Sequence, residues 1–148
     1  MRHLKLCSAV LLLAGCQVFG DGEREAGKIA RQWAEAYFNY DFREATRFVT
    51  PESEKWLHFA ASNVTEQDIE ILNATDERAT INVGDYYVGT DTTGMISVTV
   101  NNFLSMDSIG HAGSRHESEV FILEVVKRNG HWKIRMAGLP RSEKQSHD

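Results

Sequence analysis

The dipeptide Asn129-Gly130 constrains the fold more than any other feature of this sequence. It lies between two runs in which apolar and polar residues alternate, 119–128 and 131–136. An Asn-Gly pair in this setting is the strongest short-range signal for a β-hairpin with a type I′ turn, in which both central residues have positive φ. A two-residue turn also fixes the register of its strands, so the residues that face one another follow from the sequence.

Counting outward from the turn gives five cross-strand pairs. They are Arg128 with His131, Lys127 with Trp132, Val125 with Ile134, Glu124 with Arg135, and Leu123 with Met136. One face of the hairpin then collects apolar side chains and is predicted to be core: Phe121, Leu123, Val125, Trp132, Ile134 and Met136. On the opposite face, Glu124 and Arg135 are expected to form an ion pair.

Residues 24–40 have the pattern of an amphipathic helix. Their apolar residues recur at spacings of three and four and form one stripe: Ala26, Ile29, Ala30, Trp33, Tyr37 and Tyr40. A second, short helix is predicted from Phe42, because Asp41 and Glu44 have the spacing of a capping box.

A third helix is predicted to begin at Pro51 with Thr50 as its N-cap, and to end near residues 62–63. Its expected buried face is Trp56, Leu57, Phe59 and Ala60.

After residue 64 the apolar period changes from 3.6 to 2, which predicts strands. The first is expected at 69–74, with a turn at 76–77 and an antiparallel return at 79–83. A bulge at Gly84 would let the return strand extend to 86–88. A polar loop at 89–94, a long strand at 95–106 and a loop at 107–115 would then lead into the hairpin. Helices followed by antiparallel strands predict an α+β fold.

The N-terminus carries a targeting signal. A basic start and a short apolar run lead to Leu13-Ala14-Gly15-Cys16, which resembles the bacterial lipobox. The resemblance implies a signal peptide at 1–15 that is removed, lipidation of Cys16 and a tether at 16–23, before a domain at 24–138 and a polar tail at 139–148. Gln17 stands where an aspartate would imply retention at the inner membrane, so an outer-membrane location is expected. The alternative is an ordinary secretory signal cut near Gly15.

Charge and cysteine content narrow the possible partners and chemistry. Without residues 1–15 the chain keeps 14 of its 16 basic residues and all 21 acidic ones, a formal charge of −7. This balance argues against nucleic acid or an anionic membrane surface as a partner. Cys7 leaves with the signal and Cys16 is acylated, so we expect no disulfide, no cysteine nucleophile and no thiolate metal site.

Three stretches together resemble the nuclear transport factor 2-like superfamily, and in particular its small bacterial lipoproteins. They are 34–45, which contains Tyr37-Phe38-Asn39-Tyr40-Asp41-Phe42, then 49–52, and 126–134 with its Asn129-Gly130-His131-Trp132-Lys133-Ile134 run. The resemblance implies a cone-shaped α+β domain, with N-terminal helices packed on a curved antiparallel sheet of about four to six strands. The superfamily contains isomerases, dehydratases, hydrolases, transport factors and members without known activity, so the fold does not imply the function.

The resemblance also suggests where a ligand would bind. The residues that could line the cavity of such a cone are Trp33, Tyr37, Tyr40, Trp56, His58 and Tyr86. The competing interpretation is that these aromatic residues fill the cavity as core. The histidines show no metal-ligand spacing, and no phosphate-binding loop or nucleophile elbow is present, so neither a metal nor a cofactor is expected.

Catalysis in such a cone would need an ionisable group on a buried face. The acids nearest apolar stretches are Asp41, Glu44, Asp68, Asp85 and Glu124. By pattern, none stands alone on a buried face, so we expect no catalytic residue. His58 and Asp68 are the two residues that could contradict this expectation, because the pattern assigns neither of them a partner.

The sequence therefore favours a non-enzymatic envelope lipoprotein that binds a small ligand or another envelope protein. A cavity enzyme of the isomerase or dehydratase type and a purely structural surface domain are the alternatives. Pairing of two copies through the outer sheet face, with Val120, Ile122 and Val126, is also open.

Overall fold

The computed structural model describes residues 20–106 and 109–145. Cys16 and the rest of the predicted signal and lipobox lie outside this range. Within these two ranges, four α-helices and four strands follow one another in the order α1 Asp21–Phe38, α2 Phe42–Ala45, α3 Glu54–Ser62, α4 Glu66–Asn73, β1 Thr80–Thr90, β2 Thr93–Ser105, β3 Ser114–Arg128 and β4 His131–Arg135. No helix in the described ranges is long and apolar enough to cross a membrane.

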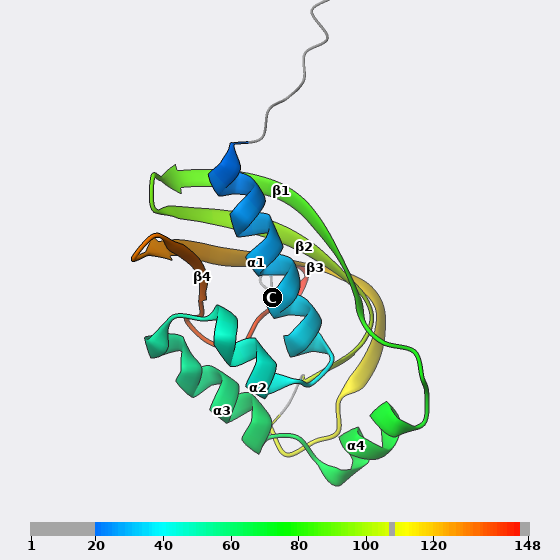
Figure 1. The fold of residues 1–148 in the computed structure, drawn as a ribbon. Helices are drawn as coiled ribbons and strands as arrows, with labels where there is room; N and C mark the ends of the chain where they lie inside the picture. Colours follow the sequence, from blue (N-terminus) through cyan, green and yellow to red (C-terminus); the bar gives the residue numbers. More distant parts are fainter. Residues whose placement is uncertain (1–19, 107–108, 146–148) are drawn as a thin grey trace, which may run out of the picture.

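The strands form one antiparallel sheet in the order β1-β2-β3-β4. The sheet curves around α1, which lies across its inner face, while α2 and α3 continue the helical layer near β4 (Figure 1). The short α4 lies at the far end of the molecule, beside the segment that joins β2 to β3. This arrangement confirms the predicted α+β class and the predicted number of strands.

The Asn129-Gly130 hairpin has the predicted geometry. Asn129 has φ of 52° and Gly130 φ of 79°, as a type I′ turn requires. Four of the five predicted pairs are present, from Arg128↔His131 to Glu124↔Arg135. The fifth is not part of the ladder, because β4 ends at Arg135 and the Met136 N–H donates to Ser53 Oγ at 2.8 Å.

Helix α1 begins three residues earlier than predicted, at Asp21, inside the segment expected to be tether. Its first turn carries Asp21 and Glu23, whose charges suit the positive end of a helix. The helix ends at Phe38, and Tyr40 has φ of 64° two residues later. The predicted helix start at Phe42 is confirmed, with Asp41 Oδ1 accepting the Glu44 N–H at 3.1 Å.

The third predicted helix is split in two. Residues Pro51–Ser53 form a 3-10 turn, and the α-helix proper begins at Glu54. Leu57 and Ala60 are buried as predicted, but Phe59 is 37% exposed, so its assignment to the buried face was wrong.

The predicted strand at 69–74 is wrong, because this segment lies within helix α4. Thr65 and Asp68 form a capping box: Thr65 Oγ1 accepts the Asp68 N–H at 3.1 Å, and Asp68 Oδ2 accepts the Thr65 N–H at 2.8 Å. Ile69 and Ile71 alternate with polar residues as in a strand, but the cap before them starts a helix. The partner of β1 is therefore β2.

The predicted loop at 89–94 is also wrong. Strands β1 and β2 run to the tip, where Thr90 pairs with Thr93 around Asp91 and Thr92. The predicted bulge at Gly84 is confirmed by the register shift between Val83 and Tyr86. Glycine is needed there, because a Cβ would lie 2.4 Å from Ser97 Oγ.

The alternation of core-facing and outward-facing residues along β2 changes near the C-terminal end of the strand. Val98 and Val100 face the core as predicted, but Asn102 has φ of 53°, and Phe103 then joins the core. Strand β3 begins at Ser114, inside the predicted loop, and continues the pairing through Phe103↔His116.

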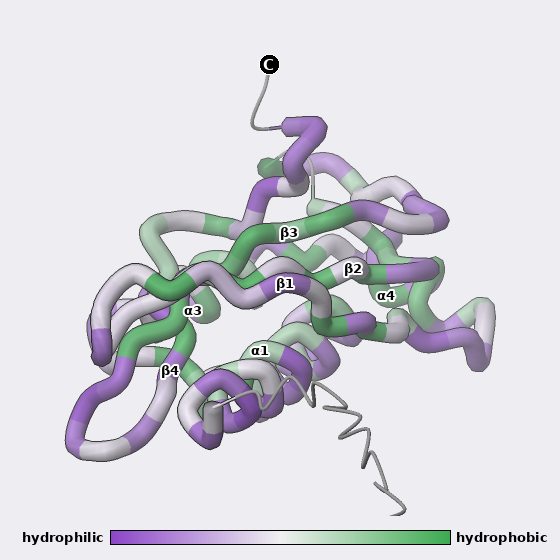
Figure 2. The backbone as a smooth tube through the Cα atoms, turned by 90° about the horizontal axis from the view of Figure 1, so that it is seen from above, coloured by the Kyte–Doolittle hydropathy of each residue, from purple (hydrophilic) through white to green (hydrophobic). Residues whose placement is uncertain are grey.

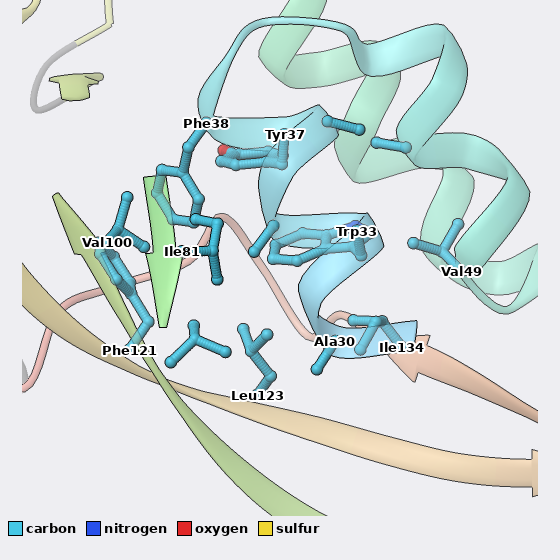
Figure 3. Close-up of a cluster of buried hydrophobic side chains, with 14 of the residues drawn as sticks. Ala30, Trp33, Tyr37, Phe38, Val49, Ile81, Val100, Phe121, Leu123 and Ile134 are labelled. Atoms are coloured by element: carbon cyan, nitrogen blue, oxygen red, sulfur yellow. The ribbon is translucent and has the colours of Figure 1, made fainter. Parts of the chain in front are cut away.

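The core lies between α1 and the inner face of the sheet. Figure 3 shows Ala30, Trp33 and Tyr37 of α1 directed toward strand residues such as Phe121 and Leu123. Trp33 and Trp132 are 0% and 4% exposed, which confirms that both belong to the core. The hydropathy of β3 agrees with the position of the core: the middle of the strand is hydrophobic and its ends are hydrophilic (Figure 2).

The C-terminal tail is not wholly loose, contrary to expectation. Ser142 is fully buried and bridges Phe121, and the Glu143 N–H donates to the Val120 carbonyl at 2.9 Å. Because β4 is only five residues long, it covers only one end of the edge of β3. The tail pairs with part of the edge that β4 leaves open.

Candidate functional site

A groove lies between α3 and the segment that follows β4. It has a volume of about 690 Å³. Its walls include two aromatic residues of α3, Trp56 and Phe59, and the aliphatic residues Met106, Ile109 and Leu139. Sites for small ligands usually have volumes of roughly 300–1,000 Å³ and mainly apolar walls. This groove has a volume in that range, and its lining combines apolar side chains with the polar residues Arg141 and Gln145.

A small inner cavity adjoins the groove. The two share Met106, Leu139, Pro140 and Gln145 as lining residues. The inner cavity has a volume of only about 40 Å³, and its deeper walls are formed by Tyr37, Phe38, Tyr40, Phe103, Glu119 and Phe121. A space this small holds water or the end of a ligand, whereas the groove is large enough for a ligand's body.

Tyr37 reaches the inner cavity from the last turn of α1. Its ring stacks on Trp33 with centroids 4.9 Å apart and meets Phe38 edge-on at 5.1 Å. In Figure 3 the Tyr37 oxygen lies on the Phe38 side of the ring. Burial raises the pKa of Tyr37 well above its usual value, so the hydroxyl stays protonated and is a potential hydrogen-bond donor.

Tyr40 closes the inner cavity beside Tyr37. Positive φ is uncommon for a residue other than glycine, and Tyr40 has φ of 64°. Its hydroxyl donates to the Leu104 carbonyl at 2.8 Å, which fixes the ring between the end of α1 and β2. The aromatic wall is thus held by both layers of the fold.

Glu119 is the residue that the sequence interpretation missed. It lies on the inner face of β3, two residues before the core residue Phe121, and its side chain is only 10% exposed. Oε1 lies 3.3 Å from His116 Nδ1, and the His116 ring stacks on Phe103 with centroids 5.4 Å apart. The expectation that no acid would stand on a buried face was therefore wrong. The period of two through Phe121, Leu123 and Val125 would have placed Glu119 there if it had been extended by one step.

The structure brings together three of the six residues expected to line a cavity. Tyr37 and Tyr40 line the inner cavity, and Trp56 lines the groove. Trp33 is buried in the core beneath Tyr37. His58 lies on the exposed side of α3, and it lines neither the groove nor the inner cavity.

Tyr86 lies elsewhere, where β1 passes the first turns of α1. It packs over Gly94, where an added Cβ would lie 2.6 Å from the Tyr86 hydroxyl oxygen. Burial and the nearby Glu23 carboxylate raise the pKa of Tyr86. Tyr86 shares a separate surface pocket with Glu23 and Gly27 of α1.

Asp68 and Glu124, two of the acids near apolar stretches, have structural roles. Asp68 is 1% exposed, and its Oδ1 accepts the Gly113 N–H at 2.7 Å while Oδ2 serves the α4 cap. Glu124 and Arg135 form the predicted ion pair. Within residues 20–106 and 109–145, no group of three or more His, Cys, Asp or Glu side chains could hold a metal ion.

Comparisons with known proteins bear on the fold. No protein-family model matches the sequence, and no curated protein is significantly similar to it. A structure of an NTF-2 like protein of unknown function from Shewanella oneidensis MR-1 matches with a TM-score of 0.52 and 12% identity, over 76% of this chain and 93% of that one. A function-unknown protein from Mycobacterium tuberculosis matches with a TM-score of 0.48 and 12% identity, over 81% and 70% of the two chains. The Shewanella match, the sheet order and the helical layer agree with one another, and the chain therefore has the nuclear transport factor 2-like fold.

Proposed function

We propose that this protein is a lipid-anchored envelope protein whose domain binds a small, largely apolar molecule in the groove. The observation that carries the proposal is the groove itself, a space of about 690 Å³ with aromatic and aliphatic walls. Two of its apolar side chains are exposed, Phe59 by 37% and Ile109 by 69%. An apolar ligand bound in the groove would cover these two side chains and remove their apolar surface from water.

The inner cavity favours a second candidate, an acid–base enzyme. A carboxylate and a protonated tyrosine hydroxyl lining one cavity are the groups that isomerase-type proton transfer uses, and Glu119 and Tyr37 supply them. We prefer binding because the inner cavity is too small for a reacting substrate.

Groove binding is tested with 1-octanol as the probe. We expect octanol to shift the amide resonances of Met106 and Leu139 in NMR titrations of the protein. Trp56→Ala should weaken binding roughly fivefold, the equivalent of about 1 kcal/mol of lost apolar contact. Tyr87→Ala is the matched control, because Tyr87 is a 53% exposed aromatic residue that does not line the groove. Resonance shifts away from the groove, or equal affinity in both variants, would contradict the proposal.

Lipid anchoring is tested at Cys16. We expect Cys16→Ser to abolish incorporation of labelled palmitate and to leave the protein uncut or released from the membrane fraction. Cys7→Ser is the matched control and should be labelled like the wild type, because Cys7 precedes the expected cleavage site. Continued labelling of the Cys16→Ser protein would refute the anchor. Helix α1 begins five residues after Cys16, so an anchored domain would lie within about 18 Å of the lipid-bearing residue.

A further inference from the structure

We propose that the groove and inner cavity select apolar molecules that end in an ammonium group, with the ammonium in the inner cavity beside Glu119. This inference rests on the proposed groove binding and adds the chemical class of the ligand. The argument depends on the charge of the inner cavity, its aromatic walls, the nearby C-terminal end of α1, and the volumes of the inner cavity and the groove.

The charge of the inner cavity is negative. Glu119 is the one charged residue among those that line it. In the described part of the chain no lysine or arginine pairs with Glu119, and its neighbour is the His116 ring. A carboxylate that is 90% buried and lacks a permanent cation loses hydration without full compensation. A ligand cation would supply the missing opposite charge.

The aromatic walls also favour a cation. Phe38, Phe103 and Phe121 form a cluster around the cavity, with ring centroids 4.7 to 5.7 Å apart. Aromatic faces carry partial negative charge and attract ammonium groups, most strongly where water is excluded. Tyr37 and Tyr40 complete the wall, so five aromatic side chains line the space that an ammonium would occupy.

The C-terminal end of α1 also favours a cation in the inner cavity. Tyr37 and Phe38 belong to its last turn, which contains no basic residue. The C-terminal end of a helix carries partial negative charge, which a cation stabilises and an anion does not. Three independent features of the inner cavity therefore disfavour a carboxylate and favour an ammonium.

The two volumes divide such a ligand into a head and a body. About 40 Å³ admits a group of few heavy atoms, such as a primary ammonium, and the groove of about 690 Å³ admits an alkyl or ring portion. Met106 and Leu139 line both spaces, which places the head and the body of such a ligand next to each other. The groove itself contains one basic side chain. Arg141 lines the groove but not the inner cavity, and it is exposed.

The test compares three probes of equal chain length: octylammonium, 1-octanol and octanoate. Their affinities for the wild-type protein are measured by titration calorimetry below the concentrations at which they aggregate. We expect octylammonium to bind about tenfold more tightly than octanol, because a charge-assisted contact is stronger than a neutral one, and octanoate to bind most weakly. This series does not depend on the folding of any variant.

The variant that tests the assignment is Glu119→Gln, which keeps the size of the side chain and removes its charge. We expect it to reduce octylammonium affinity about tenfold, to the level of octanol, and to leave octanol affinity unchanged. Glu117→Gln is the matched control, because Glu117 lies two residues away on the same strand and is exposed.

The outcomes separate this inference from the proposed function. Equal affinity for the three probes, tighter binding of octanoate through Arg141, or an ammonium preference that survives Glu119→Gln would overturn the inference and leave groove binding intact. Failure of all three probes to bind would overturn groove binding, and the inference with it. A tenfold preference that Glu119→Gln removes and Glu117→Gln retains would support both.

Discussion

Trp33→Ala is expected to lower the free energy of unfolding by about 3–5 kcal/mol, the range for removal of a large buried aromatic side chain. Trp33 is 0% exposed and lies at the centre of the interface between α1 and the sheet. It stacks on Tyr37 and meets Phe38 edge-on at 6.3 Å, so its removal would also loosen the last turn of α1. Urea unfolding followed by circular dichroism measures the loss.

Two further variants sharpen this prediction. Trp56→Ala is the surface control, because Trp56 is only partly buried on α3, and it should cost about 1 kcal/mol. Trp33→Phe should cost far less than Trp33→Ala. The Trp33 indole N–H has no hydrogen-bond partner among the described residues, so phenylalanine removes an unsatisfied buried donor as well as some volume. If the Trp33→Ala protein is as stable as the Trp56→Ala protein, the prediction that Trp33 is a core residue is wrong.

The parts of the fold that the sequence predicts well are those in which one local signal decides the geometry. Asn129-Gly130 is such a signal, because few other dipeptides accept positive φ at both positions, and the register follows from the length of the turn. The stripe of α1 is another, since it continues for several turns with a single period. In both cases tertiary packing agrees with the local preference.

The errors occur where two signals compete over a short segment. In the stretch 69–74 the alternating apolar residues favoured a strand, but the preceding Thr65-x-x-Asp68 cap decided for a helix. At 89–94 the polar, glycine-containing composition favoured a long loop. Instead the strands extend to a tight turn, because Gly94 leaves room for Tyr86 and Thr90 pairs with Thr93.

The candidate site was predictable only in part. Tyr37 and Tyr40 could be placed near a cavity from the helix that carries them and the fold that the chain resembles. The groove could not be predicted, because it forms between α3 and residues 137–141, which are distant in sequence. Extending the period-two pattern of β3 by one step would have identified Glu119. Its neighbour His116 lies before the predicted strand at 119–128, because β3 begins at Ser114.

Asp68→Asn is expected to destabilise the protein by about 2 kcal/mol at neutral pH, in the range for hydrogen bonds to a charged acceptor. The Asp68 carboxylate joins two distant segments, because it accepts the Thr65 N–H at the start of α4 and the Gly113 N–H at 2.7 Å just before β3. Asparagine has one carbonyl oxygen, so one of these N–H groups would lose its acceptor and meet an amide nitrogen instead. Asp76→Asn is the matched control, because Asp76 is exposed in the bend after α4.

The pH dependence separates the charge of Asp68 from its shape. Burial raises the pKa of Asp68, but the N–H groups of Thr65 and Gly113 stabilise the carboxylate more strongly, and the pKa lies below its usual value. A carboxyl whose pKa is lower in the folded state than in the unfolded state stabilises the fold above the unfolded value, about 3.9, and loses that contribution as pH falls through the folded value. The stability difference between wild type and Asp68→Asn, measured by urea unfolding, should therefore be constant above about pH 5 and shrink as pH falls below about 4. A difference that stays constant down to pH 2 would show that the carboxylate charge contributes nothing, and that the shape of the side chain alone holds α4 against the segment before β3.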